Sequence, residues 1–206
     1  MYNFIKATLV LTVLSLSHVA NAGLITFDTK SLQGEILSDD IKSSWDGNTK
    51  ASNSRNIEIF NMLDIGRHSI GHVNINFVVK SKALLSLDFG LDAGYGAELF
   101  VDNILVVDRS DNLWWSRNWS HSDVFTLNTY VFTKGEHNID LYFAENCCDG
   151  LSSIQLTNHY TQEVSLLSTD SLKAASVPEP ESIALFSLGL LGLAMRHKVS
   201  EKLSNK

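Results

Sequence analysis

The sequence lacks the short motifs that mark the common enzyme classes. It has no G-x-S-x-G nucleophile motif and no phosphate-binding P-loop, and its seven histidines show no H-E-x-x-H spacing. His68 and His72 lie four residues apart, but they flank a predicted glycine turn and not a helix. Only two cysteines are present and they are neighbours, so they cannot supply the four ligands that a zinc site needs. These absences leave no candidate catalytic residue and predict a protein that is not an enzyme.

Basic residues and prolines are also scarce. The net charge of the 206-residue chain is −7, and 22 of its 23 acidic residues lie between residues 23 and 182. An acidic surface excludes nucleic acid as an expected partner and offers carboxylates to calcium. The only two prolines lie in the triplet Pro178-Glu179-Pro180, which separates the body of the chain from an apolar run.

The chain begins with the pattern of a secretory signal peptide. A single lysine precedes an apolar stretch from Ala7 to Leu16, and Ala20 and Ala22 follow in an A-x-A arrangement. We expect cleavage before Gly23, an uncleaved N-terminal anchor being the alternative. The signal peptide, residues 1–22, is therefore excluded from the fold.

The other end of the chain combines the proline triplet with a short apolar run and a basic tail. The run, residues 183–195, spans roughly 20 Å as a helix, less than the ~30 Å hydrocarbon core of a bilayer. Arg196 and further basic residues follow it, and positive charge after an apolar segment keeps that side in the cytoplasm. We predict a single transmembrane helix at 183–195, joined to the folded domain by a small, polar linker at 168–176.

The order V-P-E-P, short apolar span and Arg196 resembles the PEP-CTERM sorting signal of Gram-negative bacteria, here residues 177–206. The resemblance implies that an exosortase-type enzyme in the inner membrane recognises Pro178, Glu179 and Pro180 and cuts nearby. The protein is then expected in the inner membrane before processing, and at the cell surface or in the extracellular polysaccharide matrix afterwards. An ordinary short C-terminal anchor is the alternative.

Period-2 alternation of apolar and polar residues dominates the middle of the chain. It is clear in residues 73–79, 84–89 and 137–144, and the stretch 98–108 predicts a hairpin with its turn at Asp102-Asn103. No convincing amphipathic helix is found between residues 23 and 165, and residues 33–56 are expected to be loop-rich. We predict an all-β domain over residues 23–167, an antiparallel β-sandwich of jelly-roll or lectin-like type.

Two segments of this domain resemble a known family. Residues 91–108 (LDAGYGAELFVDNILVVD) are similar to the strand–loop–strand signature of protective-antigen-type domains, the lectin-like β-sandwich also found in fungal adhesins and fibro-slime proteins. Residues 134–157 resemble the later hairpin of that family, and their Cys-Cys-x-Gly sequence resembles that of exported bacterial proteins with PEP-CTERM tails. In adhesin members, two adjacent aspartates bind calcium, which holds a sugar. This sequence has only Asp92 in the corresponding loop, so the resemblance does not by itself imply calcium-dependent sugar binding.

Three aspartates in predicted turns are the candidate calcium ligands: Asp92, Asp102 and Asp149. Loops from distant strands of a sandwich meet at one end, and calcium takes six to eight oxygen ligands, so carbonyls and waters would complete the shell. The alternative is that these aspartates only cap turns. Calcium is the one cofactor that the sequence suggests.

The stretch 112–123 (NLWWSRNWSHSD) contains Trp114, Trp115 and Trp119. Exposed tryptophan rings stack on sugar rings, so these three are candidate ligand-binding residues for an extracellular polysaccharide. The alternative is that Trp114 or Trp115 fills the core of the sandwich.

The neighbouring cysteines, Cys147 and Cys148, have three alternative fates. Their Cα atoms lie no more than about 3.8 Å apart, below the usual range for a disulfide, but an exported protein meets an oxidising environment. We predict an intramolecular disulfide that closes a tight turn. Two reduced thiols, or bridges between molecules, are the alternatives.

Together these features predict an exported, non-catalytic protein of the cell surface or matrix that binds carbohydrate or has a structural role. A secreted hydrolase acting on matrix polysaccharide is one alternative. An inert surface protein with no glycan ligand is the other.

Overall fold

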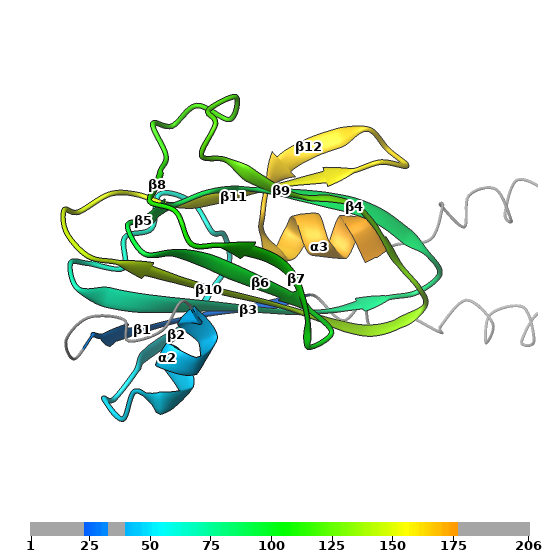
Figure 1. Ribbon diagram of the computed structural model, residues 1–206. Helices are drawn as coiled ribbons and strands as arrows, with labels where there is room; N and C mark the ends of the chain where they lie inside the picture. Colours follow the sequence, from blue (N-terminus) through cyan, green and yellow to red (C-terminus); the bar gives the residue numbers. More distant parts are fainter. Residues whose placement is uncertain (1–22, 33–39, 177–206) are drawn as a thin grey trace, which may run out of the picture.

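The computed structural model describes residues 23–32 and 40–176, which form two packed β-sheets (Figure 1). The six-stranded sheet consists, in spatial order, of β2 (Asn53–Ile57), β1 (Leu24–Ser31), β3 (Ser69–Val79), β10 (Gly135–Glu145), β6 (Gly96–Val101) and β7 (Ile104–Arg109). The four-stranded sheet consists of β12 (Glu163–Leu166), β11 (Ser153–Asn158), β4 (Ala83–Gly90) and β9 (Phe125–Phe132). A separate two-stranded sheet pairs β5 (Asp92–Ala93) with β8 (Leu113–Trp114).

The core lies between the two large sheets and follows from the alternation in the sequence. In β3, Val73, Ile75 and Phe77 are buried in the common core, whereas Asn74 and Asn76 lie on the outer face of the sheet. Burying each large apolar side chain stabilises the fold by roughly 1.5–3 kcal/mol. Neighbouring strands in each sheet run antiparallel, so the predicted antiparallel β-sandwich is confirmed.

The hairpin predicted at Asp102-Asn103 is also present. These two residues join β6 to β7, and their φ angles are 50° and 65°. A two-residue turn with both φ values positive matches the twist of the strands on either side.

The stretch expected to be loop-rich contains a helix as well as the edge strand β2. Helix α2 (Ile41–Gly47) begins after Asp40, whose carboxylate accepts a hydrogen bond from the Ser43 backbone N–H at 2.7 Å. The buried Glu98 of β6 accepts hydrogen bonds from the first two backbone N–H groups of α2, at 3.0 and 2.9 Å. Trp45 then packs on the outer face of the six-stranded sheet, so α2 covers one part of that face (Figure 1).

The stretch 168–176, predicted to be a linker, is largely helix α3 (Thr169–Ser176), so that prediction is wrong. Helix α3 lies between the two large sheets and contacts β3 and β4 (Figure 1). Its Leu172 is 1% exposed and belongs to the core. Leu172 also packs on Gly23, where an added Cβ atom would lie 2.7 Å from Leu172 Cδ1. The first described residue and the last helix are therefore in contact.

The predicted signal peptide and sorting tail lie outside the described residues, including Pro178, Glu179, Pro180, Arg196 and the transmembrane segment at 183–195. Among the described residues, no helix has both the length and the apolar character needed to cross a membrane.

Candidate functional site

The small β5–β8 sheet places a carboxylate beside an exposed tryptophan. Asp92 is the direct cross-strand partner of Trp114, and Ala93 is the partner of Leu113. Opposite residues of antiparallel strands share a face, with Cβ atoms about 4.5–5.5 Å apart. Because Ala93 and Leu113 are buried in the core, Asp92 and Trp114 lie on the outward face, where Trp114 is 58% exposed.

The carboxylate of Asp92 lies against a glycine turn. The backbone N–H of Gly150 donates a hydrogen bond to it, and a Cβ atom at position 150 would lie 1.9 Å from Asp92 Oδ2. The backbone N–H of Asp92 donates to Ser152 Oγ at 3.1 Å. Only glycine at position 150 lets the loop after β10 approach this carboxylate so closely.

Several negative charges surround Asp92. Burial raises the pKa of Asp92 to about 6, and the charges of Glu145, Asp64 and Asp149 raise it as well, against the lowering effect of the Gly150 hydrogen bond. Asp149 is exposed and accepts a hydrogen bond from Arg67 Nε at 3.2 Å. We call this region, which contains Asp92, Asp149, Asp64 and Glu145, the acidic end of the sandwich. Asp92 loses its proton there at a higher pH than an ordinary aspartate does.

Glu145 holds the loops on both sides of Asp92 in place. Its Oε1 accepts hydrogen bonds from the backbone N–H groups of Asn146 and Cys147 at 2.9 and 2.8 Å, and its Oε2 accepts one from Gly94 at 3.0 Å. Because both oxygens of this buried carboxylate bind backbone groups, Glu145 organises the site and is not a free ligand.

The structure brings together two of the three predicted calcium ligands. Asp149 lies close enough to Asp92 to raise its pKa. Asp102 lies at the tip of the β6–β7 hairpin, where its carboxylate accepts a hydrogen bond from the Asn138 backbone N–H at 2.9 Å. Asp102 thus lies beside Asn138, whereas Glu145 marks the acidic end. These two residues are seven apart on β10, so the strand separates Asp102 from the acidic end by about 23 Å. The predicted meeting of three aspartates is wrong, and the described residues hold no group of three or more acidic, histidine or cysteine side chains suited to a metal ion.

The three candidate tryptophans have different environments. Trp115 is 8% exposed, and its ring lies 4.8 Å from that of the half-buried Trp119. Trp114 instead faces outward, with its backbone N–H bonded to Asp123 Oδ2 at 3.1 Å and its ring edge-on to His121. The structure therefore leaves Trp114 as the tryptophan most accessible to a ligand and places Trp115 in the interior.

Cys147 and Cys148 lie in the loop between β10 and β11, close to the acidic end. Both are exposed and are free cysteines in the structure, and Cys148 has a φ of 59°. The intramolecular disulfide stays a prediction, which the mass of the unreduced peptide containing both residues tests.

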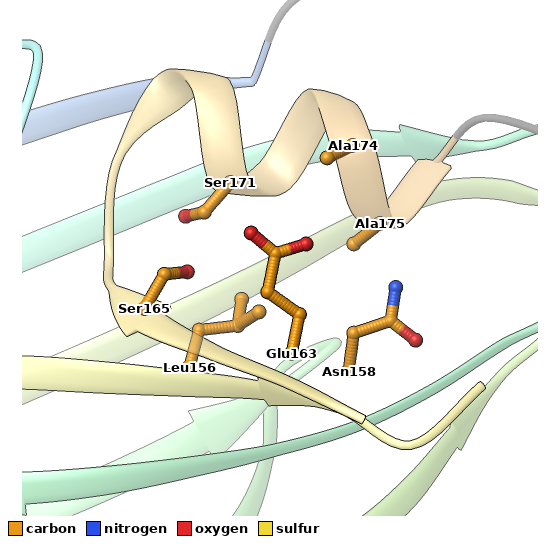
Figure 2. Close-up of a pocket in the computed structure, with 7 residues that line it drawn as sticks. All are labelled: Leu156, Asn158, Glu163, Ser165, Ser171, Ala174 and Ala175. Carbon is orange, nitrogen blue, oxygen red and sulfur yellow. The ribbon is translucent and has the colours of Figure 1, made fainter. Parts of the chain in front are cut away.

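A shallow, open hollow lies elsewhere, between α3 and the β11–β12 hairpin (Figure 2). Small, hydroxyl and amide side chains line it together with Leu156 and one carboxylate, Glu163, which points towards α3 (Figure 2). No aromatic face and no second charge adjoins Glu163 in this lining. The hollow therefore offers less than the Asp92–Trp114 end does for ligand binding.

Residues 176–198 match the PEP-CTERM protein-sorting motif. The chain carries this sorting signal. The match confirms the resemblance drawn from the proline triplet, the apolar run and Arg196. No curated protein matches the chain.

The described fold is similar to that of solved PA14 domains. A PA14 sugar-binding domain from an RTX adhesin aligns with a TM-score of 0.51 and 11% identity, over 72% of this chain and 96% of that one. An anti-sigma factor domain-containing protein aligns with a TM-score of 0.50 and 9% identity, over 72% of this chain and 47% of that one. A PA14 domain of the antifreeze protein MpAFP aligns with a TM-score of 0.47 and 14% identity, over 72% of this chain and 88% of that one. At such identities the likeness to the adhesin domain shows a shared β-sandwich fold.

We expect Asp92 to make the folded domain less stable as pH rises from about 4 to 6. A carboxyl group whose pKa is raised from 3.8 to about 6 on folding stabilises the fold fully below pH 4, and this contribution is lost as pH rises through 6. Asp92→Asn keeps an acceptor for Gly150 and removes the charge. It should raise the melting temperature at pH 7.5 by about 3–6 °C, or about 1–2 kcal/mol after allowance for partial exposure, and leave it unchanged at pH 3.5.

Thermal unfolding of both proteins at the two pH values measures this effect. Asp111→Asn is the matched control, because the hydrogen bonds from Arg109 lower the pKa of Asp111 and the same substitution should not stabilise at pH 7.5. Equal melting temperatures for Asp92→Asn and the parent at pH 7.5 would contradict the prediction.

Proposed function

We propose that this protein is an exported, non-catalytic carbohydrate-binding protein of the cell surface or extracellular matrix. In this proposal an extracellular polysaccharide binds at the acidic end of the sandwich, on the outward face that carries Asp92 and Trp114. One observation carries the proposal: a 58% exposed tryptophan is the cross-strand partner of a half-buried carboxylate. The PA14-like fold supports it, because the adhesin domain with the same fold is described as sugar-binding.

The chemistry of the two side chains suits a sugar. The flat ring of Trp114 offers an apolar surface to the C–H face of a pyranose. The carboxylates of Asp92 and Asp149 accept hydrogen bonds from hydroxyl groups, and a half-buried acceptor in low dielectric binds more strongly than an exposed one. Aromatic stacking combined with a few oriented polar groups is the usual composition of a small-molecule site.

Calcium is the cofactor that we propose for this end. Asp92 and Asp149 would supply two carboxylate ligands, and backbone carbonyls and waters the remainder of a shell of six to eight oxygens. Burial is the main cause of the raised pKa of Asp92, and a divalent cation would offset the repulsion from neighbouring carboxylates that adds to it. Protons compete with the cation for the same carboxylate, so its binding should weaken below pH 6.

The sorting signal supports two further partners. We infer that an exosortase-type enzyme processes the chain, and that the inner membrane of a Gram-negative bacterium holds it before processing. Release then brings the sandwich to polysaccharide outside the cell.

A glycan array probed with and without millimolar calcium tests the proposal. We expect binding to a subset of glycans that weakens when calcium is chelated, and a loss of at least about tenfold in affinity for Trp114→Ala. Tyr160→Ala is the matched control, because Tyr160 is an aromatic residue with the same 58% exposure in the turn between β11 and β12. Equal binding by Trp114→Ala and the parent would refute the site, cleavage of the arrayed glycans would favour the hydrolase alternative, and no binding in either condition would favour an inert surface protein.

A further inference from the structure

A row of amide side chains crosses the outer face of the six-stranded sheet, away from the acidic end. Asn74 and Asn76 come from β3, and Asn138 and Asp140 come from β10. The register pairs Asn76 with Asn138 and Asn74 with Asp140, so the four side chains form two adjacent cross-strand pairs. On the far side of β3, Thr26 of β1 is the partner of Asn74 and extends the row.

The amides of this row form one hydrogen-bonded chain. Asn138 Nδ2 donates to Asn76 Oδ1 at 3.1 Å, the Asn76 amide donates to Asn74 Oδ1, and Asn74 Nδ2 donates to Asp140 Oδ1 at 2.7 Å. His72 Nε2 also lies 2.7 Å from Asp140 Oδ1. Every donor in the chain points towards Asp140, so the side chains are held in one orientation and polarise one another.

The residue types in this row run against the preference of a β-strand. Asparagine and aspartate are depleted in strands, yet here they occupy outward positions of β3 and β10, which lie in the middle of the six-stranded sheet. Threonine or valine would suit these positions better, and no core contact requires an amide there. Positions at which a sequence departs from local preference without a gain in packing are expected to be functional.

The row is open to a ligand and its accessible part is uncharged. Helix α2 covers the other part of this face, around Ile70, Tyr142 and Ala144 (Figure 1). Asn76 is exposed and Asn138 is half-buried, while Asp140 is largely buried beneath its hydrogen bonds.

The charges nearest the row lie at its ends. The partly exposed carboxylate of Asp102 accepts the Asn138 backbone N–H at one end, and Lys42 of α2 lies near Asp140 at the other. The carboxylate of Asp28 is turned towards His72 Nδ1, at 3.6 Å, and the side chain of Asp28 is largely buried. Glu136 lies at the start of β10, and Lys30 of β1 is bonded to backbone carbonyls of Trp45 and Asn48. Between these groups the face presents amide and hydroxyl groups, together with the exposed side chain of Leu24, the cross-strand partner of Asn76.

We propose that this amide row is a second carbohydrate-binding surface, which takes an uncharged polysaccharide chain laid across β1, β3 and β10. An amide offers two donors and an acceptor with two lone pairs, which match the hydroxyl groups of a sugar. The row contains no lysine or arginine to attract an anionic polymer. It also lacks the buried aromatic anchors typical of protein interfaces. The surface does not depend on Asp92, Trp114 or calcium.

The double variant Asn76→Thr/Asn138→Thr tests this inference by affinity electrophoresis in gels containing hydroxyethyl cellulose or galactomannan. The parent protein should be retarded in these gels and not in carboxymethyl cellulose. The double variant should lose at least tenfold in affinity while its melting temperature stays the same or rises, because threonine has the higher strand preference. Asn128→Thr, the same change at an exposed position of β9 in the other sheet, should bind as the parent does.

The remaining outcomes also decide the matter. Retardation that survives in Trp114→Ala and disappears in the double variant supports the inference. Retardation that disappears in Trp114→Ala and survives in the double variant overturns it and leaves the acidic end as the binding site. A lower melting temperature with unchanged retardation shows that the row is structural and overturns the inference, as does a parent protein that migrates freely in both neutral gels.

Discussion

Replacing Leu172 with alanine should lower the free energy of unfolding by about 3–4 kcal/mol. Leu172 is 1% exposed in the core and carries the packing of α3 between the sheets. Removing its side chain leaves a cavity against Gly23 and loses the apolar burial that holds the helix. Unfolding of residues 23–176 in urea, monitored by tryptophan fluorescence, measures this loss of stability: the urea concentration at the midpoint of unfolding should fall.

The neighbouring Ala174→Ser is the control, because Ala174 is exposed and the change should cost less than about 0.5 kcal/mol. Both variants keep the length and register of α3. A Leu172→Ala protein as stable as the parent would mean that α3 does not contribute to the stability of the fold and that residues 168–176 act as a linker.

Replacing Pro178, Glu179 and Pro180 together with alanine should keep most of the protein in the inner membrane and abolish its appearance at the surface. These residues form the defining triplet of the sorting motif matched at 176–198, and the resemblance implies that the processing enzyme recognises them. The apolar run that follows is unchanged and still favours the membrane. Fractionation of the cells, with immunoblotting for size, measures the distribution.

The double replacement Glu181→Ala/Ser182→Ala is the matched control, since it changes the next two residues and leaves the triplet intact. It should reach the surface in the normal amount and size. If the triplet variant also did so, the sorting signal would not act through these residues.

The strands of the core could be predicted because each has one buried face. Alternation alone located β3, β4 and β10, and the Asp102-Asn103 pair located a hairpin turn. Helix α2 could not be found in this way: it has seven residues, and its N-terminus is held by Glu98, which lies 57 positions beyond Ile41. Helix α3 is also short and places only one leucine in the core. Its sequence therefore has too few apolar residues to show the periodicity of a helix.

The candidate site was predicted in part. Asp92, Asp149 and Trp114 were all named from the sequence, but their proximity depends on the pairing of β5 with β8 and on the close approach of Gly150. The sequence itself contains the reason why Asp102 lies away from Asp92. Asp92 precedes β6 and Asp102 follows it, so the length of this strand separates the two residues.

The contact between Gly23 and Leu172 places the start of the described domain beside the helix that leads to the sorting motif. Leu24 pairs with Asn76, whereas the acidic end adjoins Ser69, so the length of β3 separates that end from the pole where Gly23 lies. An anchor attached before Gly23 would therefore hold the sandwich by this pole, and α3, which leads to the sorting motif, packs on the same residue. The loops of the acidic end would then point away from the lipid. Cutting either tether would free a domain whose shape is already complete.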